Sequence, residues 1–178
     1  MPIRFKEVSY TYSPGTPFAY LALKHINLEL TEGKMTAVIG ATGSGKSTMV
    51  QHLNALLLPT EGSLEVGEHT IKAGEKIRNI KPLRKNVGYV FQFAEYQLFE
   101  ETLAKDIAFG PKNIGIEEDE IETRVRDAMA IVGLDYDEFS GKSPFDFNST
   151  VQPAIPSRSF SRCSLSYLCI TIFGPPVI

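Results

Sequence analysis

The glycine-rich segment Gly40–Ser47 constrains the fold of this chain more than any other feature. It has the sequence G-A-T-G-S-G-K-S, which matches the pattern G-x-x-x-x-G-K-[ST] at every position. Its glycines let the backbone turn tightly and approach phosphate oxygens, because a Cβ atom would obstruct that approach. Successive backbone N–H groups then point into one anion-binding concavity. The pattern predicts an α/β fold of the P-loop NTPase type, in which a buried strand precedes the loop and a helix follows it.

The residues on both sides of this loop have the character that such a fold requires. Met35–Ile39 (M-T-A-V-I) is mostly apolar and β-branched, which predicts a strand buried on both faces of a parallel sheet. A helix is expected to begin at about Gly45 and to be ended by Pro59. The apolar residues that recur at helical spacing within it are Met49, Val50, Leu53, Leu56 and Leu57.

The chemistry expected of the loop is the binding of ATP together with Mg²⁺. The positive end of the following helix meets the phosphates. Lys46, a predicted catalytic residue, places a positive charge between the β- and γ-phosphates, and Ser47 supplies a hydroxyl ligand to the magnesium ion. Thr48 can donate one more hydrogen bond. The predicted nucleotide contacts are Gly40, Ala41, Thr42, Gly43, Ser44, Gly45, Lys46, Ser47 and Thr48.

An N-terminal antiparallel β subdomain is predicted from the alternation of apolar and polar residues. Ile3–Val8 is expected to be a half-buried strand, paired with Leu23–Leu30 across a turn region at Ser13–Thr16. The other predicted elements are a hairpin of Gly62–Val66 and His69–Lys72, a strand at Val87–Phe91, and an amphipathic helix over Asp119–Val132 that stops at Gly133.

Composition and charge exclude several classes of function. The chain is 43% apolar and 22% charged, as in ordinary soluble domains, and its net charge of −3 gives no reason to expect a nucleic-acid partner. No run approaches the roughly 20 apolar residues that span a bilayer, and the N-terminus does not resemble a signal peptide. Any membrane role is therefore expected to be peripheral. The two cysteines, Cys163 and Cys169, favour a cytosolic compartment over a disulfide framework.

Two further segments carry a resemblance to a known family. They are F-K-E-V-S-Y-T-Y, from Phe5, and the run A-L-K-H-I-N-L-E-L-T-E-G-K that leads into the loop. Together with the loop they resemble ABC transporter ATPases. The resemblance implies that Tyr12 stacks on adenine, with Tyr10 as the weaker candidate. It also implies that Gln92, in V-F-Q-F, is a catalytic residue that positions magnesium and the attacking water, and that it marks the start of a helical subdomain.

The run from Phe91 to Pro111 is similar to the ATPases of energy-coupling factor (ECF) transporters, and most similar to their second A-type subunit. Ala94 stands where that subfamily usually has proline. The resemblance covers about Pro2–Asp146. It implies an ATPase held peripherally at the cytoplasmic face of the cell membrane, which drives uptake of a vitamin or metal ion. The implied partners are a second ECF ATPase, a transmembrane scaffold subunit and a membrane substrate-binding subunit.

The resemblance ends where the family continues with L-S-G-G-Q. This chain has Phe147-Asn148-Ser149-Thr150-Val151-Gln152 there, and no apolar run followed by Asp-Glu comes later. Segment 131–135 resembles that run and ends in Asp, but tyrosine follows where the family has Glu. The family also has a switch histidine after the Asp-Glu pair, and all three histidines of this chain lie too early in the sequence to match it. We therefore expect residues 1–146 to be the N-terminal part of an ABC ATPase domain. Residues 147–178 are expected to be a non-family tail, with a frameshift, a sequence error and a genuine variant as alternatives.

Three functional interpretations follow. The favoured one is an ECF ATPase subunit in which this chain alone binds ATP but hydrolyses it weakly or not at all, because a general base and the signature are missing. The second is an inert nucleotide-binding fragment that docks on transporter partners through residues 92–111. The third is a P-loop kinase or GTPase, disfavoured because some forty residues precede the loop and no N-K-x-D guanine motif is present.

Overall fold

The computed structural model describes residues 2–77, 79–91, 97–146 and 168–171. Contacts divide the chain into two compact units, and each is described by itself. The first comprises residues 1–87 with 172–178, and the second comprises residues 88–171. No helix in the described parts combines the length and the apolar character needed to cross a bilayer.

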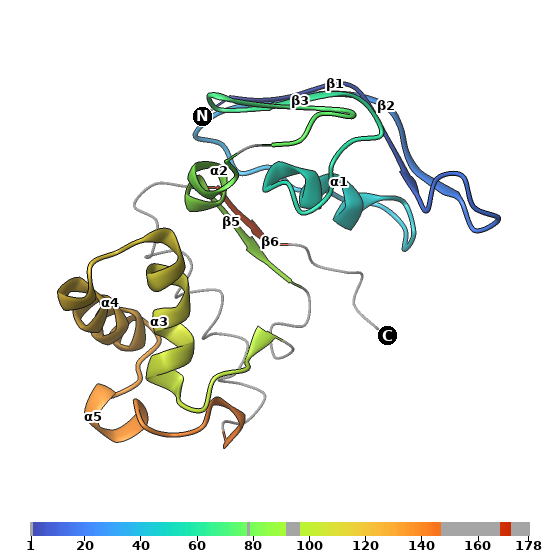
Figure 1. The fold of residues 1–178 in the computed structure, drawn as a ribbon. Coiled ribbons are helices and arrows are strands. Elements are labelled where there is room, and N and C mark those ends of the chain that lie inside the picture. The colour runs from blue at the N-terminus through green and yellow to red at the C-terminus, as the bar shows by residue number, and fades with distance from the viewer. Residues whose placement is uncertain (1, 78, 92–96, 147–167, 172–178) are drawn as a thin grey trace. The chain divides into compact units, whose positions relative to one another are not determined.

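A four-stranded antiparallel sheet forms most of the first unit (Figure 1). Its strand order is β2-β1-β3-β4, and β1 pairs with β2 in a register that places Tyr12 opposite Tyr20. Ile3, Phe5 and Val8 of β1 are buried. The two strands predicted at Ile3–Val8 and Leu23–Leu30 and the predicted hairpin are confirmed, although β1 and β2 are longer than expected. The strands are β1 (Ile3–Tyr12), β2 (Tyr20–Leu30), β3 (Glu61–Val66) and β4 (His69–Lys72).

The helix that follows the glycine-rich loop, α1 (Lys46–Leu53), is shorter than predicted. Pro59 does not end this helix. The chain leaves the helix at Asn54, and the next residue, Ala55, has a φ of 51°. The amide of Ala55 donates to the carbonyl of His52 (3.0 Å), and the amide of Leu56 donates to the carbonyl of Gln51 (3.0 Å). These two bonds form a Schellman motif, which satisfies the last helical carbonyls. The helical spacing of Leu56 is therefore coincidental.

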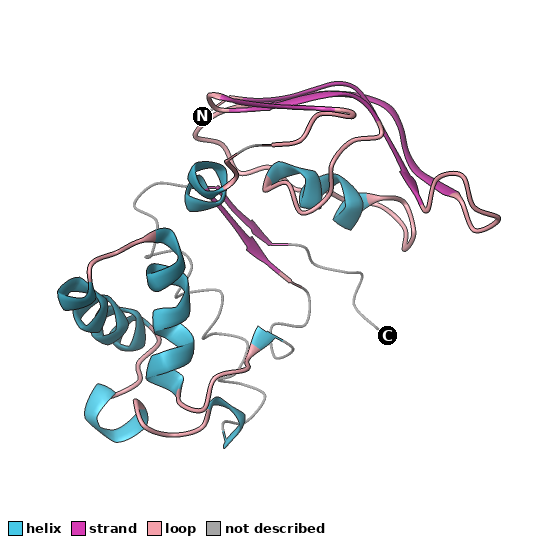
Figure 2. Cartoon of the chain, viewed as in Figure 1, coloured by secondary structure: helices cyan, strands magenta, loops and turns pink. Residues whose placement is uncertain are grey.

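The prediction of a buried strand at residues 35–39 is wrong for the described structure. Figure 2 draws this segment as loop, and Met35 and Ile39 are 100% and 91% exposed. A strand exists only when a neighbouring strand accepts its hydrogen bonds, and a buried one needs layers on both faces. Among the described residues no strand pairs with this segment. Its apolar, β-branched composition is a local property and cannot supply those neighbours.

A short helix, α2 (Lys81–Asn86), completes the described part of the first unit. Arg84 of this helix donates from Nε to the carbonyl of Asn54 and from Nη2 to the carbonyl of Ala55, both at 3.3 Å. These bonds support the turn that ends α1. Strand β5 (Val87–Val90) follows and pairs with β6 (Leu168–Thr171).

The second unit is built around α3 (Leu103–Ile114) and α4 (Glu118–Ile131). The predicted helix and its stop are confirmed: Gly133 has a φ of 76°, and the amides of Gly133 and Leu134 donate to the carbonyls of Ala130 (3.1 Å) and Met129 (3.0 Å). The buried residues shared by the two helices are Leu103, Ile107, Ala108, Ile121, Val125, Ala128 and Met129.

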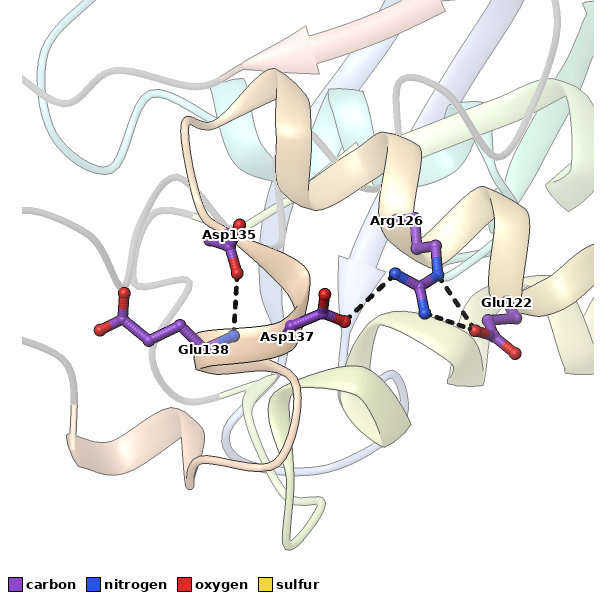
Figure 3. A network of polar contacts seen from close by, with 5 residues as sticks. All are labelled: Glu122, Arg126, Asp135, Asp137 and Glu138. Carbon is purple, nitrogen blue, oxygen red and sulfur yellow. Dashed lines mark hydrogen bonds and ion pairs between the residues drawn. The ribbon is translucent and has the colours of Figure 1, made fainter.

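An arginine-centred network links α4 to α5 (Tyr136–Phe139), as Figure 3 shows. Arg126 donates to Glu122 at 3.0 and 2.8 Å and to Asp137 at 3.4 Å. Its guanidinium carbon lies 3.7 Å from the centroid of the Tyr136 ring. The Asp135 side chain caps α5 by accepting from the Glu138 amide at 2.9 Å. The chain then turns through the 3-10 helix Pro144–Asp146.

Candidate phosphate-binding site

The glycine-rich loop enters α1 through Gly45, a position that only glycine satisfies. Gly45 is the residue before the helix and has a φ of 84°, a left-handed conformation that side chains disfavour. A Cβ atom there would lie 2.7 Å from the carbonyl oxygen of Ala22 and 2.9 Å from Cδ2 of Leu23. The missing Cβ therefore lets the loop approach β2 closely.

The start of α1 presents unpaired backbone donors. The first four N–H groups of an α-helix have no acceptor within the helix, and here the first helical turn closes with the Met49 amide donating to the Gly45 carbonyl at 2.8 Å. No side chain of the described residues caps this end, and its first turn holds no acidic residue. The backbone donors and the helix dipole are therefore suited to an anion at this end of the helix.

Lys46 adds a full positive charge at the loop. Its Nζ donates to the carbonyl oxygens of Gly40 (2.8 Å) and Ala41 (2.7 Å), so the side chain folds back along the loop. The Ser44 amide donates to the Ala41 carbonyl at 3.2 Å and tightens the loop into a turn. Ser47, the next residue, is exposed and its hydroxyl is accessible to a ligand.

A cavity of about 340 Å³ lies against the loop. Two residues of β2, Tyr20 and Ala22, form one wall, and the segment 43–48 forms the other. The structure thus brings together six of the nine predicted loop contacts around one space. Gly40, Ala41 and Thr42 belong to the loop but do not line this cavity.

Two tyrosines that face each other across β1 and β2 reach the loop. The Tyr12 hydroxyl lies 3.0 Å from Thr48 Oγ1, where either oxygen can donate, and the Tyr20 hydroxyl donates to the Gly43 carbonyl at 3.3 Å. The assignment of Tyr12 to adenine stacking stays a prediction. Sequence reasoning missed Tyr20, because the second strand was expected to start at Leu23 instead of at Tyr20.

Tyr10 belongs to the packing beneath the site. Its ring meets the Tyr12 and His52 rings edge-on, with centroid separations of 4.8 and 5.0 Å. Burial raises the pKa of Tyr10 and lowers the pKa of His52. His52 Nδ1 lies 2.6 Å from the Thr48 carbonyl, which can only accept, so Nδ1 carries the proton. These contacts anchor the buried face of α1.

The predicted catalytic Gln92 lies outside the described residues, as does Ala94. Among the described residues, no group of three or more histidine, cysteine, aspartate or glutamate side chains gathers to hold a metal ion. Of the two predicted magnesium ligands, Ser47 has an exposed hydroxyl at this site, and Gln92 stays a prediction.

A family model and curated relatives place this chain among known proteins. The model described as "ABC transporter" matches residues 23–150. An energy-coupling factor transporter ATP-binding protein EcfA2 of Clostridium acetobutylicum is 50% identical over 148 residues, covering 83% of this chain and 51% of the relative. The protein of the same name from Latilactobacillus sakei is 54% identical over 148 residues, covering 83% and 50%. The chain spans about half the length of the curated relatives it matches.

Solved structures share the fold. cbiO1 from Clostridium perfringens, described as part of the ABC transporter complex cbiONQ, has a TM-score of 0.68 at 31% identity, covering 89% of this chain and 60% of that chain. A dimeric bacterial ABC transporter cassette has a TM-score of 0.71 at 26% identity, covering 88% and 68%. These neighbours confirm the predicted fold class.

Proposed function

This chain belongs to the ABC transporter family, and we propose that it binds ATP with Mg²⁺ at Gly40–Thr48 as an ATP-binding subunit of an ECF importer. The observation that carries the proposal is the uncapped start of α1 behind Gly45, with the Lys46 ammonium beside it. Membership of the family removes the reason to consider a P-loop kinase or GTPase.

The described residues fit a nucleoside triphosphate with its metal ion. The N–H groups at the start of α1 would hold phosphate oxygens, since they have no acceptor within the helix. Lys46 would exchange its carbonyl partners for phosphate oxygens, which are stronger acceptors. Ser47 would bind the metal ion, whose chemistry is to neutralise charge on the transferred phosphoryl group. Gln92 is proposed, on the resemblance alone, to position the attacking water.

Partners and location are also proposals. Relatives named as ECF transporter ATP-binding proteins, and a structural neighbour described as part of an ABC transporter complex, support assembly with other subunits. The proposed partners are a second ATPase, a transmembrane scaffold and a membrane substrate-binding subunit, met at the cytoplasmic face of the membrane. The proposed cargo is a vitamin or metal ion.

A second candidate function is nucleotide binding without turnover. The sequence from Phe147 onward holds neither L-S-G-G-Q nor an apolar run followed by Asp-Glu. ABC-type hydrolysis needs a signature from one subunit and a general base from the other, so this chain alone would bind ATP with weak or absent turnover. The proposed boundary between the family domain, residues 1–146, and the tail, residues 147–178, rests on this change of sequence.

The test is calorimetric titration of the full chain with Mg-ATP. We expect binding that Lys46→Ala weakens at least about 100-fold, because a charge-assisted contact to phosphate is lost. Lys24→Ala, an exposed lysine on β2, is the control and should bind like the unaltered chain. Equal affinity of the Lys46 and Lys24 variants would overturn the proposal.

A further inference from the structure

We propose that Tyr20 forms the nucleoside wall of this site, with its ring packed against the ribose and base of the bound nucleoside triphosphate. This inference rests on the proposed function and adds a binding residue to it. Tyr20 lies outside the glycine-rich motif, and it lies eight positions beyond Tyr12, the residue that the resemblance assigns to adenine.

The position of Tyr20 in the cavity carries the inference. Six cavity-lining residues, 43–48, belong to the loop and the start of α1, and their N–H groups and the Lys46 ammonium are suited to phosphate. The other two lining residues are Tyr20 and Ala22. They are two positions apart on β2 and so lie on the same face of the strand. A nucleotide whose phosphates occupy the loop side therefore presents its nucleoside to this wall.

Tyr20 has the exposure and the anchoring that such a wall requires. The residue is 55% exposed, so much of its surface is available to a ligand. Its hydroxyl donates to the Gly43 carbonyl at 3.3 Å, which fixes the direction of the ring relative to the loop. The small side chain of Ala22 beside it leaves room for a ligand. A ring held in place by one end loses little conformational freedom on binding.

Tyr12 is placed differently, which leaves a distinct role for Tyr20. The Tyr12 ring already meets Tyr10 edge-on at 4.8 Å, and its hydroxyl contacts the buried Thr48. In the described structure Tyr20, and not Tyr12, lines the cavity. We therefore expect Tyr20 to contribute to nucleotide affinity independently of any contact that Tyr12 makes.

The test separates the nucleoside from the phosphates by using two ligands, Mg-ATP and Mg-tripolyphosphate, with the full chain. Tyr20→Ala should weaken ATP binding about tenfold, in the range measured for a base stacked on an aromatic side chain. It should leave tripolyphosphate binding within about twofold. Tyr20→Phe keeps the ring and should retain ATP affinity within about threefold. Tyr20→Leu keeps apolar bulk and should lose nearly as much ATP affinity as Tyr20→Ala.

Controls make both possible failures recognisable. Leu21→Ala, on the opposite face of the same strand and 50% exposed, should bind both ligands normally. Equal ATP affinity of Tyr20→Ala and the unaltered chain would overturn the inference. A second result would also overturn it: Tyr20→Ala loses the same affinity for ATP as for tripolyphosphate, and Tyr20→Phe binds ATP as weakly as Tyr20→Ala. Tyr20 would then act only by holding Gly43 in place through its hydroxyl. Absence of ATP binding by the unaltered chain would instead overturn the proposed function.

Discussion

The carbonyl oxygen of Ala22 occupies the space that a side chain on Gly45 would need. A Cβ atom at residue 45 would lie 2.7 Å from that oxygen, well inside van der Waals contact. The loop and β2 are therefore in backbone contact at Gly45, and a side chain at this position could not be accommodated without moving the backbone.

The first prediction concerns this close approach. Gly45→Ala should destabilise the chain by at least about 2 kcal/mol, because it adds a backbone clash to the cost of a left-handed φ. It should also abolish Mg-ATP binding, since the start of α1 must shift. Urea unfolding and calorimetry measure the two effects.

Gly74→Ala is the matched control for this variant. Gly74 has a φ of 76°, but a Cβ there would meet nothing within 4 Å. It should cost only about 1 kcal/mol and leave ATP binding unchanged. If both variants lost the same stability and both bound ATP, the prediction would be wrong, because the close approach of Gly45 to Ala22 would then contribute to neither stability nor ATP binding.

A second prediction concerns the metal ion. Ser47→Ala should weaken binding of Mg-ATP about tenfold, because the ion loses its one proposed ligand in the loop. Binding of ATP in the presence of EDTA should not change. Thr31→Ala, which removes an exposed hydroxyl outside the loop, should leave both affinities as they are. An equal loss with and without magnesium would show that Ser47 binds phosphate instead.

A third prediction is a pH dependence of stability that arises from His52. Its Nδ1 donates to the Thr48 carbonyl, and its buried Nε2 has no hydrogen-bond partner among the described residues. Burial lowers the pKa of His52 below the value of 6.5 expected for an unfolded chain. Below pH 6.5 the unfolded chain therefore binds more protons than the folded chain. The stabilisation is complete above pH 6.5 and is lost as pH falls through the folded pKa.

Urea midpoints between pH 7.5 and 5.0 test this dependence. His52→Leu should reduce the fall in stability over that range. His25→Gln alters a largely exposed side chain and should retain the steep fall seen in the unaltered chain. A His52 variant whose stability falls as steeply as that of the unaltered chain would contradict the assignment.

A fourth prediction tests the end of α4. Gly133→Ala should destabilise the helical unit by about 1 kcal/mol, because its φ of 76° is in the left-handed region. Gly141→Ala, at a position where a Cβ would meet nothing within 4 Å and φ is not left-handed, should be nearly neutral. Hydrogen exchange of the α4 amides measures the difference locally. Equal protection in the two variants would contradict the capping role.

Sequence reasoning succeeded where local chemistry decides the structure and failed where distant partners do. The helix start near Gly45 and the helix stop at Gly133 were predicted because glycine tolerates the tight backbone turns found at helix ends. The strand at residues 35–39 was predicted wrongly because its partners lie outside its own sequence. Tyr20 was missed because β1 and β2 pair with irregularities between Phe5 and Thr11, which set the register that brings Tyr20 opposite Tyr12.

The positions of Tyr12 and Tyr20 at the loop also give the chain an intrinsic fluorescence signal for ligand binding. The sequence has seven tyrosines and no tryptophan, so no indole masks phenol emission. Among the described residues, Tyr12 and Tyr20 contact the loop through their hydroxyls. A ligand that enters the loop changes the surroundings of both phenols, so the tyrosine fluorescence of the unlabelled chain should report occupancy directly.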